Sequence, residues 1–304
     1  MVMVNEIDKV ILTRLHREQA PLSGERLRSE CGISRVAVWK HINRLRERGF
    51  LLSSSSKGYC LDGDSYDFER LHALGCAVVY EYRLASTMDL VPDNDSDEVI
   101  VLAEEQTGGR GKRSVVWHSP PGGIYYTHIW HPDIPLERVM TVMLAGAVSV
   151  ACALREHGVE AMVKWPNDVL VGEKKIAGIL VEFGGEYDWV KSVKTGFGIN
   201  VNNQTHSTDT VSLVELLGRK TDRTGLLIRQ FDLYNSLVRS EDAANRTVAL
   251  WHTLSATLGR RVRMQTRDRT VTGLAKAVRD NGSLVVETDD GTVEVIASGS
   301  CEHL

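Results

Sequence analysis

Apolar residues in the first fifty positions recur with the spacing of helix faces. Positions 7, 10, 11 and 15 are apolar, which predicts a first helix. Ser23 and Ser34 can each cap a further helix; the second ends at Gly32, and the third runs to about Arg48. Gly49 then supplies a C-terminal stop. Two helices joined by a tight, glycine-containing turn indicate a helix-turn-helix.

The third helix has one apolar and one basic face, and a wing follows it. Residues 50–52 and 59–61 are apolar and flank a polar run, which predicts a two-stranded ribbon. Because Val38, Ile42 and Leu45 share one side of the helix, the other side can point outward to the major groove and phosphates of DNA. The candidate DNA-binding residues are Ser34, Arg35, Lys40, His41, Arg44 and Lys57. A solvated appendage that contacts another protein is the alternative.

Strand-like runs in the middle of the chain end in polar residues. Residues 78–82 lead to Ser86 and Thr87, and residues 99–103 lead to Gln106. The uncharged run 139–154 is shorter than the roughly 20 residues of a membrane span, so a buried helix is expected and no membrane is implied.

The tail alternates apolar and polar residues in short runs. Turn pairs at 281–282 and 290–291 separate these runs, which predicts a small antiparallel β-barrel. The pattern therefore predicts an α+β chain with a winged helix-turn-helix at 1–63, a linker at 64–74, a mixed α/β catalytic domain at 75–253 and the barrel at 254–304.

Charge is distributed unevenly along the 304 residues. The formal net charge of −4 combines a head (1–63) with 11 basic and 7 acidic residues and a remainder with 25 basic and 33 acidic residues. Only the head is basic, as expected of a nucleic-acid binder. The five cysteines are scattered and odd in number, and Glu6, Asp8 and Lys9 interrupt any signal peptide, so a reducing cytoplasm is expected.

The segment 107–114 combines glycines with three cations, Arg110, Lys112 and Arg113. Such glycines let the backbone approach a ligand, which predicts a mobile anion-binding loop. It is not a P-loop, because Gln106 stands where a glycine is required and Arg113 follows Lys112. Taken alone, a flexible basic surface turn explains it as well.

Two further segments place polar groups beside glycines. Lys164, Asn167 and Asp168 surround a proline that prevents simple continuation of a strand. Lys175 precedes the apolar run 176–182. The glycine in this run indicates that a ligand or another backbone segment approaches the strand closely. The run 196–200 likewise contains two glycines, which permit close approach, and it ends in Asn200.

In this order, these segments resemble the catalytic domain of biotin protein ligases, from about Tyr80 to Asn202. The stretch 34–42 and the pair 58–59 resemble the DNA-binding heads of biotin operon repressors. The resemblance implies an enzyme that makes biotinyl-5′-AMP from biotin and ATP with Mg²⁺ and transfers biotin to a lysine of a biotin carboxyl carrier protein or carboxylase carrier domain. It also implies a homodimer that represses biotin genes on operator DNA, with biotinyl-5′-AMP as corepressor.

The resemblance also implies roles for particular residues. Biotin-binding residues are Ser86, Thr87, Met88, Gln106, Gly109, Arg110, Gly111, Lys112 and Lys175. ATP-binding residues are Arg110, Lys112, Arg113, Trp117, Lys164, Asn167 and Asn200. Catalytic residues are Lys175, Lys112, Lys164 and Asp168, with Asp168 also the candidate ligand of Mg²⁺, although an Asx turn explains Asp168 nearly as well. Family members usually have arginine at Lys112 and often asparagine at Met88, and Ser114 and Val115 also depart from the usual pattern.

Two other functions fit the same residues. A transcription factor that senses biotin without catalysis would not need cations that face ATP, and a ligase for another acyl group such as lipoate would share the chemistry. In the ligase mechanism a carboxylate must approach a polyanion. One favourable charge pair 4 Å apart contributes about 4 kcal/mol at an effective dielectric near 20, so the cations above can lower this barrier.

Overall fold

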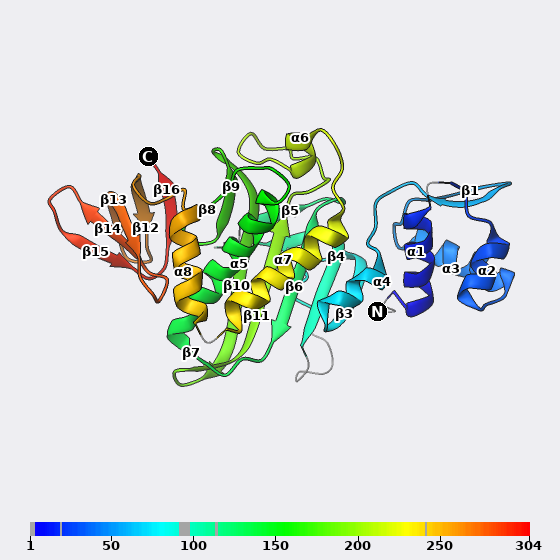
Figure 1. Ribbon diagram of the computed structural model, residues 1–304, viewed down its shortest axis with the longest axis horizontal. Helices are drawn as coiled ribbons and strands as arrows, with labels where there is room; N and C mark the ends of the chain where they lie inside the picture. The colour runs from blue at the N-terminus through cyan, green and yellow to red at the C-terminus, as the bar shows by residue number, and fades with distance from the viewer. Residues whose placement is uncertain (1–3, 19, 91–97, 113–114, 241) are drawn as a thin grey trace.

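Three groups of elements follow one another along the long axis of the molecule (Figure 1). The computed structural model describes residues 4–18, 20–90, 98–112, 115–240 and 242–304. A helical head comes first, a large mixed sheet covered by helices forms the middle, and a small antiparallel sheet carries the C-terminus. This arrangement confirms the α+β fold class expected from the sequence.

The head is a winged helix-turn-helix. The side-chain oxygen of Ser23 accepts a hydrogen bond from the Arg26 amide at 3.2 Å, and that of Ser34 accepts one from the Ala37 amide at 3.1 Å. Both caps therefore form as predicted. The elements are α1 (Glu6–Arg17), α2 (Gly24–Cys31), α3 (Arg35–Glu47), β1 (Leu52–Ser55) and β2 (Gly58–Leu61).

Two basic side chains of α3 turn inward, so their expected outward orientation is wrong. Asp8 of α1 is fully buried. His41 Nδ1 lies 2.7 Å from Asp8 Oδ1, and Arg44 Nη2 lies 2.8 and 2.9 Å from the two carboxylate oxygens. A carboxylate buried in the head needs such partners, because an unpaired buried charge costs several kcal/mol.

Buried ionic contacts hold the segment between head and sheet. Arg223 is fully buried and donates to Glu104 at 2.8 and 3.2 Å and to Asp64 at 2.8 Å. Its guanidinium also lies over the Tyr66 ring, 4.4 Å from the centroid. Residues 64–74, expected to form a linker, include the short helices α4 (Phe68–Leu71) and η1 (His72–Leu74). The network therefore joins this segment to the sheet and to a helix that covers it.

The central sheet has the strand order β3-β4-β6-β11-β10-β9-β8, with β5 paired to β4 and β7 to β11. The pair β3 and β4 is parallel, and the other described pairs in this sheet are antiparallel. The strands are β3 (Ala77–Leu84), β4 (Val99–Arg110), β5 (Val116–Ser119), β6 (Ile124–Trp130), β7 (Ile134–Pro135), β8 (Ala161–Lys164), β9 (Asp168–Val171), β10 (Lys174–Glu186) and β11 (Trp189–Ile199).

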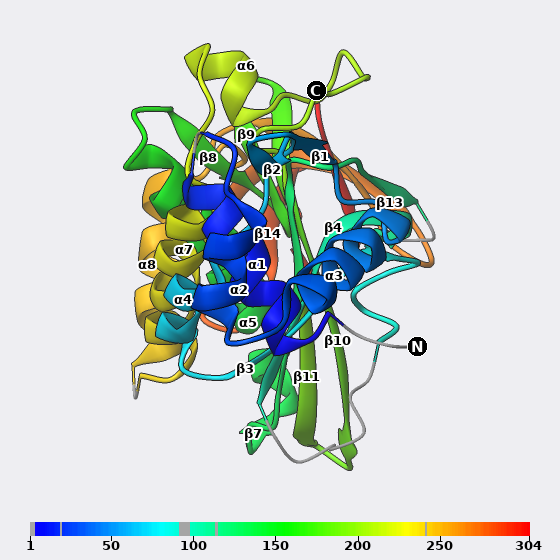
Figure 2. The same cartoon turned by 90° about the vertical axis from the view of Figure 1, so that its right-hand side faces the viewer.

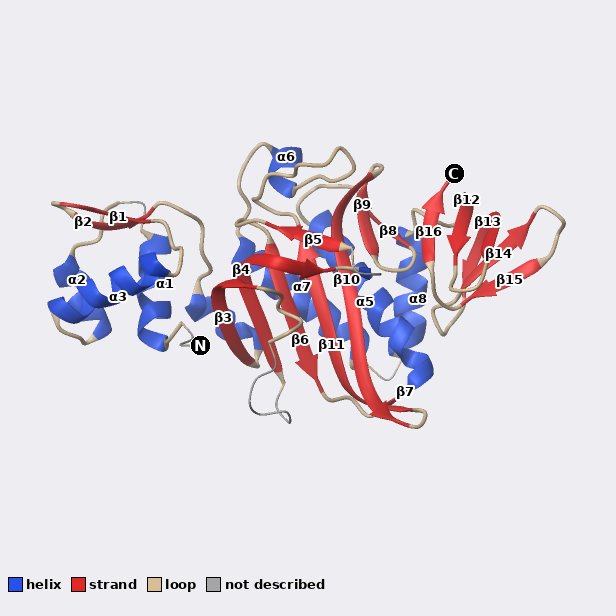
Figure 3. Cartoon of the chain, turned by 180° about the vertical axis from the view of Figure 1, so that it is seen from behind, coloured by secondary structure: helices blue, strands red, loops and turns tan. Residues whose placement is uncertain are grey.

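Helices cover one face of this sheet and leave the other to the hairpin of β4 and β5 (Figures 2 and 3). The covering helices are α5 (Val139–Arg155), α7 (Arg223–Val238) and α8 (Ala243–Leu254); η3 (Leu136–Arg138) precedes α5, and α6 (Leu213–Leu217) precedes α7. The stretch Leu136–Arg155 is long and apolar enough to cross a membrane, but most of it is buried inside the protein. A Cβ at Gly146 would lie 3.1 Å from Ile179 of β10, so α5 packs closely on the sheet. The expected buried helix is confirmed.

The C-terminal sheet has the order β15-β14-β13-β12-β16. The predicted antiparallel strands are present, and β16 is an additional strand that the alternating pattern did not indicate. The end strands β15 and β16 do not pair with each other in the described residues, so the barrel is open between them. The strands are β12 (Arg261–Gln265), β13 (Thr270–Val278), β14 (Leu284–Thr288), β15 (Val293–Ile296) and β16 (Ser300–His303).

Replacing Arg223 tests the buried network. Arg223→Met leaves Glu104 buried without its cation, and we expect the free energy of unfolding to fall by about 3–5 kcal/mol in denaturant titrations. Arg229 on the same helix pairs with Glu156 at 2.7 Å, but both side chains are half exposed. Arg229→Met should therefore cost less than about 1 kcal/mol. Equally small losses in the two variants would contradict a stabilising role for the network.

Candidate functional site

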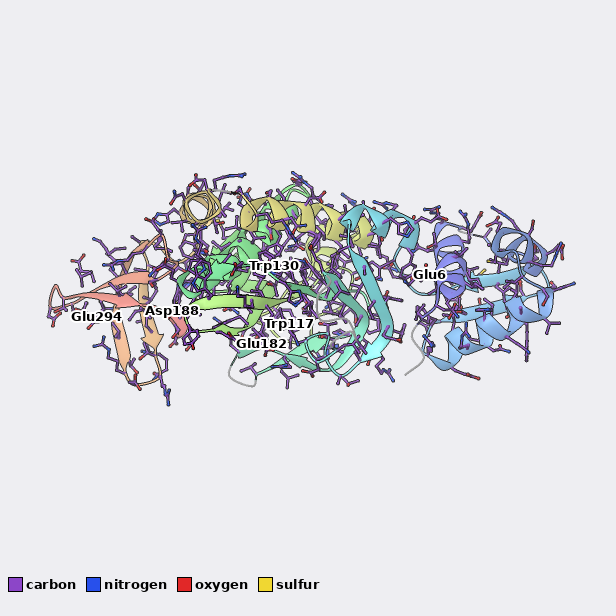
Figure 4. The ribbon with its side chains drawn as sticks, turned by 90° about the horizontal axis from the view of Figure 1, so that it is seen from below. Glu6, Trp117, Trp130, Glu182, Asp188 and Glu294 are labelled. Atoms are coloured by element: carbon purple, nitrogen blue, oxygen red, sulfur yellow. The ribbon has the colours of Figure 1, made fainter. Side chains whose placement is uncertain are left out.

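The face of the central sheet opposite the helices carries a cavity of about 420 Å³. Figure 4 shows Trp117 and Glu182 on this side of the sheet, with Trp130 toward α7. The lining of the cavity comes from the turn after β3, the β4–β5 hairpin, the 165–168 turn, β10, β11 and the start of β16. The lining residues are Ser86, Thr87, Met88, Gln106, Arg110, Gly111, Lys112, Val115, Val116, Trp117, Trp165, Pro166, Asn167, Asp168, Lys175, Gly178, Ile179, Leu180, Gly196, Phe197, Gly198, Gly299, Ser300 and Cys301.

The floor of the cavity is made by glycines that face each other on β10 and β11. Gly178 is paired with Gly198, and the next pair is Ile179 with Phe197. Because side chains alternate across a strand, Ile179 and Phe197 pack against α5 while the glycines face the cavity. A Cβ at Gly198 would lie only 2.3 Å from Trp117 Nε1. The glycines therefore make room for a flat ring, which in this structure is the Trp117 indole.

The segment expected to be a mobile loop is largely a β-hairpin. Gln106 is paired with Ser119, Gly109 with Trp117 and Arg110 with Val116. A Cβ at Gly109 would lie 2.4 Å from the Trp117 carbonyl oxygen, so this glycine permits close strand pairing and does not line the cavity. The prediction of a loop over 107–114 is therefore wrong for 107–110, which belong to β4, and Arg113 and Ser114 lie outside the described residues.

Hydrogen bonds fix the polar end of the cavity. Gln106 Oε1 accepts from the Thr87 amide at 2.8 Å and from the Thr87 hydroxyl at 3.1 Å, and Gln106 Nε2 donates to Ser119 Oγ at 2.8 Å. Thr127 on β6 donates to Thr87 Oγ1 at 2.8 Å. Gln106 and Thr87 are thus held in one orientation, as a recognition site for a polar ring requires.

Met88 forms an apolar wall next to this polar end. It is 4% exposed, and a Cβ at Gly196 would lie 2.6 Å from its sulfur atom. The Met88 amide donates to Ser86 Oγ at 3.2 Å, which holds the turn after β3. Position 88 therefore offers a ligand a thioether and no amide.

Lys175, Arg110 and Lys112 all line the cavity. Lys175 Nζ lies 2.7 Å from Asp168 Oδ1 and 5.0 Å from the centre of the Trp117 ring. Arg110 forms ion pairs with Asp89, at 2.6 Å, and with Glu182 on β10. In each of these three ion pairs, a ligand anion can replace the carboxylate as the partner of the cation.

Three other residues predicted for the site lie elsewhere or serve the backbone. Lys164 is not part of the lining; it lies opposite Asp168 in the register of β8 and β9. Burial, together with the positive charge of Lys164, lowers the pKa of His303 to about 4. Asn200 is buried outside the lining and accepts from Asn203 at 3.0 Å. Asn167 lines the cavity, but its amide donates to the Ile179 carbonyl at 2.6 Å.

The C-terminal sheet contributes a wall that the sequence did not indicate. Gly299, Ser300 and Cys301 line the cavity, and none of them is among the residues predicted for the site. Burial raises the pKa of the Cys301 thiol to about 11, so Cys301 acts as an apolar contact. The Trp165 amide donates to Thr257 Oγ1 at 3.0 Å, and this bond fixes the 165–168 turn to the tail.

The predicted DNA-binding residues divide into two sets. Ser34, Arg35, Lys40 and Lys57 are exposed on α3 and the wing, whereas His41 and Arg44 bond Asp8. Arg46 joins α3 to the wing by donating to the Leu52 carbonyl at 2.9 Å. The wing is thereby held beside α3.

Family models match three parts of the chain. Residues 80–189 match the "Biotin/lipoate A/B protein ligase family", residues 257–304 the "Biotin protein ligase C terminal domain", and residues 9–60 an "HTH domain". A biotin protein ligase from Aquifex aeolicus, solved with biotin and ATP, superposes with a TM-score of 0.64 at 24% identity, over 75% of this chain and 98% of that one. At this identity the likeness concerns the fold alone.

Curated relatives match nearly the whole chain. The "Bifunctional ligase/repressor BirA" of Escherichia coli is 28% identical over 88% of each chain, and the "Biotin--[acetyl-CoA-carboxylase] ligase" of Mycobacterium tuberculosis is 30% identical over 69% of this chain and 80% of that one. The "Bifunctional ligase/repressor BirA" of Bacillus subtilis is 33% identical over 91% of this chain and 92% of its own length. On this similarity, the chain belongs to the family of bifunctional biotin ligase/repressor proteins.

Proposed function

We propose that this protein joins biotin to ATP as biotinyl-5′-AMP and then transfers biotin to a lysine of a carboxylase carrier domain. The observation that carries the proposal is the convergence of Lys175, Lys112 and Arg110 on one cavity with a glycine floor. Its volume of about 420 Å³ is within the range of small-molecule sites. The chain belongs to the ligase/repressor family, which supports the same activity.

Biotin would lie with its polar ring at Thr87 and Gln106 and its carboxylate toward Lys175. One carboxylate oxygen attacks the α-phosphorus of ATP, the bond to the pyrophosphate oxygen breaks, and biotinyl-5′-AMP and pyrophosphate form. Lys175 and Lys112 offset the repulsion between the two anions, each favourable pair contributing about 4 kcal/mol at 4 Å and an effective dielectric near 20. Lys164 lies outside the lining and would act on the phosphates only through its charge.

Mg²⁺ would enter with the nucleotide. Asp168 is the one carboxylate in the described lining, and the described residues contain no cluster of three or more His, Cys, Asp or Glu side chains that could hold a metal. Mg²⁺ prefers one or two carboxylates with phosphate oxygens and water, so this donor set fits an ion that the nucleotide mainly holds. The ion would neutralise charge on the phosphates.

In the second step the carrier lysine must attack as a neutral amine. Its nitrogen bonds to the acyl carbon of biotinyl-5′-AMP, AMP leaves, and the nitrogen loses one proton. Asp168 would accept that proton; the position of its carboxylate in the lining beside Lys175 supports this role. Asp168 would thus position Lys175 and contribute to Mg²⁺ binding in the first step, and accept the proton in the second.

DNA repression would use the head, with biotinyl-5′-AMP as corepressor and a homodimer as the binding form. The outer edge of β10 supports dimerisation: β9 pairs with it only as far as Gly178 and Asn167 bonds Ile179, so 180–186 have no strand partner on that side in the described residues. Unpaired sheet edges readily accept another strand. Phe183 is 51% exposed there and would be covered by the second copy.

Lys175 provides the first test of the ligase proposal. Lys175→Met should lower biotin-dependent exchange of pyrophosphate into ATP by at least about 100-fold, since a cation at the reacting oxygens is lost. Lys174→Met is the matched control, because Lys174 is exposed and adjacent strand residues point to opposite faces. Transfer of biotin to an apo carrier, detected with streptavidin, should fall in parallel. Adenylation of lipoate and not biotin, or biotin binding with no exchange in the unaltered protein, would contradict the proposal.

Lys112 tests how well one lysine retains the intermediate. Lys112→Arg restores a planar, bidentate group for the phosphate, so biotinyl-5′-AMP should leave the protein about tenfold more slowly. The release rate is measured by trapping labelled adenylate with excess unlabelled ligand. Equal rates in the two proteins would show that the lysine suffices.

The β10 edge tests the coupling of ligand, dimer and DNA. Biotin with ATP should promote dimerisation in sedimentation equilibrium and tighten operator footprints, and Phe183→Glu should weaken both by at least about tenfold through a buried charge. Adenylate formation should be unchanged, and Val293→Glu, at a 59% exposed position in the tail, should have no effect. Operator affinity that is the same with and without ligands would contradict the coupling.

A further inference from the structure

The outward face of α3 is more apolar than its sequence suggests. His41 and Arg44 turn toward Asp8, so two of the polar side chains expected to contact DNA are absent from this face. Val36 is 64% exposed and Trp39 is 55% exposed, and both lie among the first five residues of α3. Being three positions apart, they are neighbours on one side of the helix.

These two side chains contribute nothing to the core of the head. The buried side of α3 is formed by Val38, Ile42 and Leu45, which are all fully buried. Val36 and Trp39 therefore expose apolar area that becomes covered only when something docks on α3. Burial of that area would favour docking at roughly 25 cal/mol per Å².

Charge around the two residues favours DNA as the partner. Arg35 and Lys40 are exposed on the same helix, and Lys57 is exposed on the wing; Lys40 and Lys57 form no ion pair with another described residue. An apolar pair surrounded by cations matches the major groove, where phosphates line the rim and thymine presents a 5-methyl group. An apolar protein partner would not require the cations.

We propose that Val36 and Trp39 read thymine 5-methyl groups on neighbouring base pairs of the operator; this inference rests on the proposed DNA binding of the head. The two Cα atoms are separated by about 4.5 Å along the helix axis, which is close to the base-pair step of about 3.4 Å. Arg35 and Lys40 would position the helix on the phosphates, and the apolar pair would supply sequence preference.

The test uses a duplex selected from a random pool by the full chain with biotin and ATP. Each thymine is replaced in turn by deoxyuridine, which lacks only the methyl group. The unaltered protein should lose about fourfold in affinity at the positions that Val36 and Trp39 read, the effect of one methyl-sized apolar contact. At those positions Trp39→Ala and Val36→Ser, which lack the apolar groups, should bind thymine and deoxyuridine duplexes equally, whereas Trp39→Phe should keep most of the preference.

Controls separate this inference from the DNA-binding proposal itself. Leu51→Ala removes another exposed side chain of the head outside α3, and should keep the full preference for thymine. Thermal unfolding of each variant should match the unaltered protein, because the residues replaced are exposed. If no duplex is bound at all, the DNA-binding proposal fails. If DNA is bound but no deoxyuridine lowers affinity, or Trp39→Ala keeps the preference or instead abolishes self-association, the inference about Val36 and Trp39 is overturned.

Discussion

The register between β10 and β11 is the constraint on which the site depends. It places Gly178 opposite Gly198 and turns both toward the cavity, while Ile179 and Phe197 face α5. A slip of one residue would reverse every side chain, so that an isoleucine and a phenylalanine would fill the floor. Packing of α5 on Ile179 and Phe197 prevents that slip, because the helix contacts them through Gly146. The same contacts that form the core thus create the space for ligand.

Local sequence patterns predicted the elements and much of the site. The remaining features depend on contacts between residues that are distant in the sequence. The helices of the head, its wing and the buried helix at 139–154 follow from spacing and caps, and Lys175 and Lys112 do reach one cavity. The inward turn of His41 depends on Asp8, 33 positions earlier, which no pattern on α3 reveals. The wall at Ser300 and Cys301 depends likewise on how the tail packs against the Trp165 turn.

Charge in the cavity is balanced before any ligand arrives. Arg110 is shared by Asp89 and Glu182, and Lys175 is held by Asp168, so the cations are oriented and partly neutralised. A ligand anion must exchange with these carboxylates, and its binding energy is the difference between two pairings. Glu182 belongs to β10, the strand with the unpaired edge. An anion that draws Arg110 away therefore releases Glu182, a partly exposed carboxylate on β10, so the Arg110–Glu182 pair connects the ligand site to the edge proposed for dimerisation.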